Sequence, residues 1–181
     1  TWVNHADPQW RQLYEAARAT AGDEGRSASV DADNLARYHN KDELRYSLRS
    51  VAQNLPWARR IHVFTNCARP AWLKDDDPRI AWVRHDEVMP AEYLPVFNSH
   101  VIESYLHRIP DLTEHFVYLN DDFLVMTPLG KSHFFDANGT SRIQFEPYGM
   151  VAGPVRPGDP DYLNAARNSA RLIARRFGHV P

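Results

Sequence analysis

The sequence predicts an α/β protein: a mostly parallel sheet with flanking helices, folded as a single domain over residues 1–181. Segments in which apolar residues recur at helical spacing alternate along the chain with short apolar runs that have strand character. That order is typical of parallel sheets joined by crossover helices. The chain is 43% hydrophobic and 24% charged, and 181 residues are enough to bury a core.

Capping residues and periodicity predict where each element lies. The first helix follows Asp7, a suitable N-cap, and has Pro8 in its first turn. Ser99 can cap a helix that reaches Arg108, before Pro110. The predicted helices are 8–19, 42–54, 99–108 and 162–177. The predicted strands are 61–65, 79–83, 116–119 and 142–146. Turn-forming residues predict loops at 21–33 and 148–161.

Charge and cysteine content exclude several classes of function. The 21 Lys and Arg residues and 23 Asp and Glu residues give a formal net charge of −2, so no overall positive field attracts nucleic acid or anionic lipid. Cys67 is the single cysteine, which excludes an internal disulfide framework and a cysteine-rich zinc site. No apolar run approaches the ~20 residues of a membrane span.

The strongest local signal is an apolar run, 116–119, that leads directly into Asn120, Asp121 and Asp122. Oxygen ligands at the carboxyl end of a strand suit Mg²⁺ (or Mn²⁺), which binds one or two carboxylates together with phosphate oxygens of a substrate. The alternative is that Asn-Asp-Asp is an ordinary turn after a strand. Spacing alone leaves both interpretations open.

A second signal lies at the start of the predicted helix 99–108. With Ser99 as the cap, the first amides of the helix would be free to bind an anion beside Asn98 and His100. Glu103 would point toward the same region and could position a hydroxyl or accept its proton. The alternative is an ordinary helix start with a favourable acidic residue near its positive end.

Two arginines on the predicted helix 42–54 form the third signal. Arg45 and Arg49 are four residues apart and share one face, and the arginine side chain can grip phosphate with two parallel hydrogen bonds. The alternative is a solvated face with local ion pairs. No glycine-rich phosphate loop is present, so metal, arginine and helix amides would have to bind any nucleotide diphosphate.

Several pieces of the chain resemble, in order, the conserved regions of the Stealth family. Residues 42–50 (DELRYSLRS) resemble the opening of its second region, and Asn98–His100, His107–Pro110 and Tyr118–Asp122 resemble later parts of that region. This resemblance covers about 38–135. Residues 1–3 are similar to the end of the first region. Residues 179–181 are similar to the start of the third, whose hallmark is a His-x-Pro-His motif.

Stealth proteins are sugar-phosphate transferases that include bacterial capsule polymerases and the lysosomal-targeting N-acetylglucosamine-1-phosphotransferase. The resemblance implies transfer of hexose-1-phosphate from a UDP-sugar (a UDP-N-acetylhexosamine or UDP-hexose) to a hydroxyl of a glycan acceptor. A phosphodiester forms and UMP leaves, in bacterial capsule or exopolysaccharide synthesis. The resemblance also implies a truncated half of a glycosyltransferase A-like, Rossmann-like fold. We expect a cytoplasmic location, with loose attachment to the inner membrane face left open.

The resemblance also suggests roles for individual residues. Asp121 and Asp122 would hold the metal, with Asp121 also acting in catalysis. Glu103 and His179 are the two candidates for the base that receives the acceptor proton, and the choice between them stays open. The residues expected to bind substrate are Arg45, Arg49, Asn98, His100, Arg108 and Asn120.

The chain departs from the family pattern at both ends. Asn4 and His5 follow Thr1–Val3 where family members usually carry Asp-Gly. The sequence stops at Pro181, before the second histidine of the third region, so we expect these 181 residues alone to be inactive. Two other functions remain: a metal-dependent glycosyltransferase that releases UDP, and a non-catalytic carbohydrate-binding module that uses tryptophans as sugar platforms.

Overall fold

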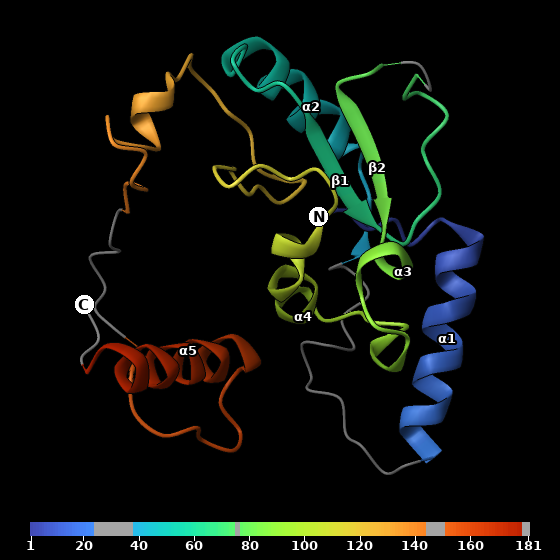
Figure 1. Ribbon diagram of the computed structural model, residues 1–181. Helices are drawn as coiled ribbons and strands as arrows, with labels where there is room; N and C mark the ends of the chain where they lie inside the picture. The colour runs from blue at the N-terminus through green and yellow to red at the C-terminus, as the bar shows by residue number, and fades with distance from the viewer. Residues whose placement is uncertain (24–37, 75–76, 144–150, 179–181) are drawn as a thin grey trace. The chain divides into compact units, whose positions relative to one another are not determined.

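The computed structural model describes residues 1–23, 38–74, 77–143 and 151–178 (Figure 1). The chain divides into two compact units, 1–25 with 35–143, and 26–34 with 144–181. Every predicted site residue except His179 belongs to the first unit, and His179 lies outside the described residues. No helix within the described ranges is both long and apolar enough to cross a membrane.

The sheet of the first unit consists of two parallel strands, β1 (Ile61–Thr65) and β2 (Ile80–Arg84). Ile61 lies opposite Ile80, and Thr65 lies opposite Arg84. The prediction of β1 is confirmed residue for residue, and β2 begins one residue later than predicted. The α/β class with parallel pairing is therefore confirmed for the residues described.

The predicted strand 116–119 is wrong as a strand. The segment forms no strand ladder with any described residue, and Phe116 at its start is 41% exposed. Its apolar character favours burial, but a strand also needs a neighbouring edge to satisfy its backbone groups. The predicted strand 142–146 is not formed at 142–143, and 144–146 lie outside the described residues.

Of the two helices that precede the sheet, α1 (Pro8–Asp23) begins at the predicted residue and α2 (Glu43–Asn54) begins one residue later than predicted. α1 is capped by Asp7, whose Oδ1 accepts hydrogen bonds from the backbone nitrogens of Gln9 (2.8 Å) and Trp10 (3.2 Å). The helix extends four residues beyond the predicted end. α2 leads into β1 and buries Leu44 and Val51, as its periodicity predicts.

An aromatic core packs beside the amino end of the chain. Trp2, Trp10 and Tyr14 are buried in one cluster with Leu44 and Val63. The Thr65 hydroxyl at the end of β1 donates to the carbonyl oxygen of Trp2 (2.7 Å), which ties residues 1–3 to the carboxyl end of that strand.

The chain after β2 forms short helices in place of one long one. α3 (His85–Val88) and the 3-10 helix η2 (Ala91–Tyr93) come first. The predicted helix 99–108 is divided at Tyr105 into α4 (Ser99–Ser104) and the 3-10 helix η3 (Leu106–Arg108). The Tyr105 nitrogen bonds to the Ile102 carbonyl (3.1 Å), a tightened turn that ends α4. A further 3-10 helix, η4, spans Lys131–His133.

The described part of the second unit is a turn followed by a long helix. α5 (Asp161–Phe177) matches the predicted helix and ends at Gly178, which adopts the left-handed conformation (φ 80°) common after helix ends. Arg167 is buried and pairs with Asp159 of the preceding turn at 2.7 Å, so the turn is held against its own helix.

Candidate active site

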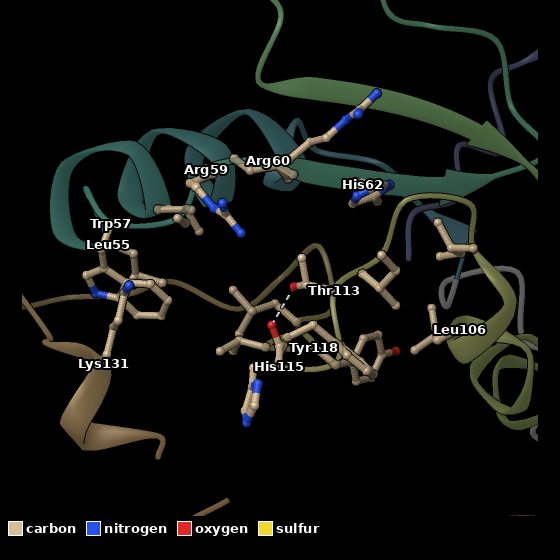
Figure 2. A pocket seen from close by; sticks show the side chains of 18 of the residues that line it. Leu55, Trp57, Arg59, Arg60, His62, Leu106, Thr113, His115, Tyr118 and Lys131 are labelled. Atoms are coloured by element: carbon tan, nitrogen blue, oxygen red, sulfur yellow. Dashed lines mark hydrogen bonds between the residues drawn. The ribbon is translucent and has the colours of Figure 1, made fainter. Parts of the chain in front are cut away.

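A cavity of about 1080 Å³ in the first unit is bordered by β1, by the segment 116–121 and by two of the predicted site residues. In Figure 2, Arg59, Arg60 and His62 lie on the β1 side of this cavity, and Thr113, His115 and Tyr118 lie opposite. Asn120 and Asp121 also line it, and so does Thr1. The acidic end of the segment 116–122 therefore borders a space large enough for a ligand.

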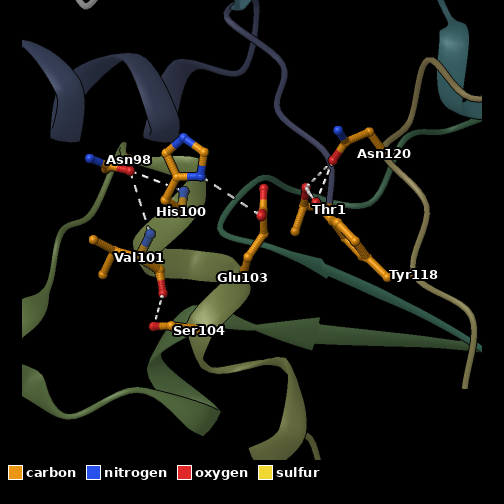
Figure 3. A network of polar contacts seen from close by, with 8 residues as sticks. All are labelled: Thr1, Asn98, His100, Val101, Glu103, Ser104, Tyr118 and Asn120. Carbon is orange, nitrogen blue, oxygen red and sulfur yellow. Dashed lines mark hydrogen bonds and ion pairs between the residues drawn. The ribbon is translucent and has the colours of Figure 1, made fainter. Parts of the chain in front are cut away.

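Tyr118 organises the polar network at this end of the cavity (Figure 3). Its hydroxyl donates to Oδ1 of Asn120, and the Thr1 hydroxyl lies 3.3 Å from it. The Thr1 hydroxyl also contacts Oδ1 of Asn120 (3.4 Å). These contacts fix the Asn120 carboxamide by its oxygen. Within the described ranges no group accepts a hydrogen bond from its Nδ2, which leaves that amide nitrogen to donate to a ligand.

Glu103 reaches the same network from α4. In Figure 3 its carboxylate lies between His100 and the pair formed by Thr1 and Tyr118, and its Oε2 is 4.0 Å from Nδ1 of His100. Burial raises the pKa of Tyr118 to about 12, and the negative charges of Glu103 and Asp121 add to the rise. The Tyr118 hydroxyl therefore stays protonated at neutral pH and remains a hydrogen-bond donor.

The two aspartates differ in their surroundings. Asp121 is partly buried, and this desolvation raises its pKa to about 6, with further contributions from the charges of Asp122 and Glu43. Asp122 is exposed. Since Glu43 opens α2 and Glu103 belongs to α4, carboxylates from three separate parts of the chain influence one region.

The predicted arginines have fewer described contacts with this network than Asn120, Asp121 and Glu103 have. Arg45 is half-buried on α2, and among the described residues its side chain makes no ion pair and no hydrogen bond. Arg49 is exposed, and the exposed Arg108 has its guanidinium 5.8 Å from the ring centre of Tyr105. The geometry thus unites Asn120, Asp121 and Glu103, while Arg49 and Arg108 have no described contact with them.

Asn98 caps α4, where the sequence suggested Ser99. Its Oδ1 accepts hydrogen bonds from the backbone nitrogens of His100 (3.0 Å) and Val101 (3.4 Å). Two of the first amides of the helix are therefore already bonded, and the expectation that they are free for an anion is wrong. His100 still lies next to Glu103, and Asn98 orients the start of α4 as its cap.

The cap gives a direct stability test. We expect Asn98→Ala to lower the free energy of unfolding by about 1 kcal/mol, because two amides of α4 lose their acceptor. Ser99→Ala is the matched control, since the Ser99 hydroxyl makes no described capping bond, and it should change stability by less than about 0.5 kcal/mol. Urea unfolding of both variants measures the difference, and equal losses would contradict the assignment of the cap.

The donor set fits a divalent metal only when a substrate supplies further ligands. The described residues contain no group of three or more His, Cys, Asp and Glu that could hold a metal alone. Asp121, however, is a partly desolvated carboxylate with acidic neighbours, and a cation beside it would relieve the cost that raises its pKa. Mg²⁺ commonly binds through one or two carboxylates and substrate phosphates.

The raised pKa of Asp121 predicts a pH-dependent stability. The folded chain binds a proton at Asp121 more readily than the unfolded chain, so this group lowers the free energy of unfolding as pH rises from about 4 to about 6. This rise in the pKa of Asp121 changes the free energy of unfolding by at most about 3 kcal/mol. Partial exposure of the side chain reduces that change to about 1–2 kcal/mol.

We therefore expect Asp121→Asn to stabilise the metal-free chain by about 1–2 kcal/mol at pH 8 and to have little effect below pH 4. The exposed Asp122→Asn is the matched control and should stay within about 0.5 kcal/mol at both pH values. Urea unfolding at the two pH values checks this. Destabilisation by Asp121→Asn at pH 8 would contradict it.

Sequence reasoning missed Tyr118 and Thr1 as members of the network. A signal for Tyr118 was available, because residues two apart in an extended segment share a side, and Tyr118 is two residues before Asn120. Nothing local to the sequence could reveal Thr1, which is 119 residues from Asn120. Cys67 lies outside this network, and burial raises the pKa of its thiol to about 11.

Comparison with known families identifies the class of protein to which this fold and site belong. A family model described as Stealth protein CR2, conserved region 2, matches residues 37–143, which include α2, the sheet, α4 and the acidic segment. The chain belongs to the Stealth family.

Curated relatives match along nearly all of the chain. The capsular polysaccharide phosphotransferase SacB of Neisseria meningitidis serogroup A is 42% identical over 98% of this chain and 31% of its own length. An exopolysaccharide phosphotransferase of Streptomyces coelicolor is 45% identical over 99% of this chain and 30% of its own. The capsular polysaccharide phosphotransferase LcbA of Aeromonas hydrophila is 42% identical over 99% of this chain and 49% of its own length. The chain thus spans between about a third and a half of these relatives.

Proposed function

We propose that this chain supplies part of the active site of a phosphotransferase in capsular or exopolysaccharide synthesis. The observation that carries the proposal is that Asp121 and the Tyr118–Asn120 pair line one cavity, and that the Glu103 carboxylate lies beside Tyr118. Relatives that cover the whole chain are named capsular and exopolysaccharide phosphotransferases. Carboxylates and fixed amides in one place suit phosphoryl transfer, which relies on positioning and on neutralising phosphate charge.

The proposed reaction transfers hexose-1-phosphate from a UDP-sugar to a hydroxyl of a glycan acceptor. The acceptor oxygen forms a bond to the phosphorus that carries the sugar, the bond from that phosphorus to the oxygen of UMP breaks, and the acceptor proton passes to a base. Glu103 is suited to be this base because its carboxylate lies beside Tyr118, whose own side chain lines the cavity. His179 remains the second candidate for that role.

The chain's own groups would hold the donor in place. Asn120, fixed through its oxygen, offers its amide nitrogen to a donor oxygen, and the protonated Tyr118 preserves that orientation. Arg45 is the arginine of α2 with the least exposure and is proposed to face the diphosphate. Asp121 and Asp122 would hold Mg²⁺ or Mn²⁺, which when bound supplies positive charge to phosphate oxygens.

Further parts of the proposal concern the whole protein. We propose a glycosyltransferase A-like core for the full-length molecule, a cytoplasmic site of action with UDP-sugars as donors, and no activity for residues 1–181 alone. A carbohydrate-binding module with tryptophan platforms finds less support, because none of the five tryptophans, all within the described ranges, is exposed. Buried or half-buried indoles make poor open platforms.

The test is product analysis with the full-length protein, a UDP-sugar, Mg²⁺ and a panel of glycans. Phosphorus NMR should show a new phosphodiester, and chromatography should show UMP. Release of UDP with no phosphorus in the glycan would instead identify a glycosyltransferase that breaks the bond between the sugar and phosphate. Glycan binding without turnover and without need of metal would identify a binding module.

A further inference from the structure

The outer edge of β1 carries buried backbone groups without a strand partner. The backbone nitrogen of Ile61 bonds to the carbonyl of Arg79 (2.6 Å), so Ile61, Val63 and Thr65 direct their backbone groups toward β2. Because successive residues of a strand direct these groups to opposite sides, those of His62 and Phe64 point away from β2. The sheet in the described ranges has only two strands, yet Phe64 is 1% exposed. Unpaired backbone groups this deep are costly.

A second open edge faces the first across the cavity. The segment 116–119 lines one wall and β1 lines the other. No described residue forms a strand ladder with 116–119, although its sequence has strand character. Most of the cavity wall between them is apolar and includes Leu48, Val51 and Val117. Two edges that each lack a neighbour, with an apolar space between them, have the form of a sheet with its middle strand missing.

Residues 1 and 2 lie where such a strand would end. The backbone nitrogen of Thr1 contacts the carbonyl oxygen of Leu119 (3.3 Å), on the wall formed by 116–119. The carbonyl oxygen of Trp2 accepts from the Thr65 hydroxyl (2.7 Å), at the carboxyl end of β1. Thr1 also lines the cavity. A chain that reached Thr1 through this space would run parallel to β1 and end beside Asn120.

We propose that the cavity accepts one extended strand, parallel to β1, formed by the residues that directly precede Thr1 in the full-length protein. The strand order becomes β2, β1, the added strand and then 116–119. A strand as long as β1 covers about 17 Å. Relatives of which this chain covers 30–49% leave ample length for it outside these 181 residues.

The added strand has a consequence for the site. It aligns Asn120 and Asp121 with the carboxyl edge of a four-stranded parallel sheet, the edge at which open α/β sheets bind ligands. The inference concerns chain packing and does not depend on the transfer reaction, so the two can fail separately.

Hydrogen exchange of backbone amides, followed by NMR, tests this with three proteins. They are residues 1–181, the same chain extended upstream by the ten residues that its gene encodes before Thr1, and the full-length protein. We expect the His62 and Phe64 amides to exchange on the order of 100-fold more slowly in both longer proteins. The Val63 amide, already bonded to β2, is the internal control and should change much less.

The other possible occupants give different results. Protection that appears only when residues after Pro181 are present would show that another segment fills the cavity. Protection of residues 1–181 that depends on protein concentration would show that a second copy fills it. Either result would overturn the proposal. The proposal would also be overturned if the His62 and Phe64 amides exchanged equally fast in the chain extended upstream, or if the gene encoded no residues before Thr1. If the extended chain fails to fold, a synthetic peptide of the same ten residues added to residues 1–181 should produce the protection; without it, the proposal fails.

Discussion

Asp121→Asn and Asp122→Asn in the full-length protein should each lower sugar-phosphate transfer on the order of 10³-fold. Each change keeps the size of the side chain and removes one negative charge from the place where the metal and the donor diphosphate are proposed to meet. The loss should fall mainly on kcat, because charge on the phosphate oxygens must be neutralised most strongly in the transition state.

Asp111→Asn is the matched control for both variants. Asp111 lines the same cavity, but its side chain is 75% exposed and pairs with Arg60 at 3.6 Å. We expect its kcat to stay within about threefold of the wild type. A loss equal to that of Asp122→Asn would show that any negative charge around the cavity matters, and would remove the specific role of the paired aspartates.

Asp121→Asn should also separate activity from stability. The same substitution that is expected to abolish transfer is expected to stabilise the metal-free chain at pH 8, because Asp121 is a carboxylate held at a cost by its surroundings. A group retained despite such a cost is typical of a functional site. Loss of both activity and stability would indicate a structural role instead.

Glu103→Gln in the full-length protein should lower kcat by about 10² to 10⁴-fold if Glu103 receives the acceptor proton. Glutamine keeps the length of the side chain but cannot accept that proton. The exposed Glu92 of η2 offers a control, and Glu92→Gln should be neutral.

His179 provides the competing outcome. If Glu103→Gln keeps most of its kcat while His179→Gln loses it, the base is His179, and Glu103 only positions the acceptor hydroxyl. Retained kcat in Glu103→Gln together with a raised KM would likewise assign Glu103 to binding and not to proton transfer.

Local signals predicted most of the elements of this chain correctly. Asp7 and the apolar periodicity that follows it were enough to place α1, and the five residues of β1 were found without error. Where prediction failed, a nonlocal partner decides the structure. Residues 116–119 have strand character, but their sequence carries no information on which edge they would join.

Part of the candidate site was predicted from the sequence, and part of it was missed. Asp121 and Glu103 were found from residue type and context, and the structure brings their charges together on Tyr118. The cap of α4 was misplaced by one residue, because Asn98 and Ser99 are both good capping residues and only geometry distinguishes them. Thr1 could not be predicted, since its contact with Asn120 spans almost the whole first unit.

The fate of the phosphorus atom tests the central proposal most directly. The full-length protein is given a UDP-sugar labelled with radioactive phosphorus in the phosphate attached to the sugar, together with Mg²⁺ and acceptor glycan. We predict that the label enters the polymer with wild-type protein, that unlabelled UMP is released, and that Asp122→Asn incorporates almost none. Label that leaves as UDP, or equal incorporation by Asp122→Asn, would contradict sugar-phosphate transfer at this site.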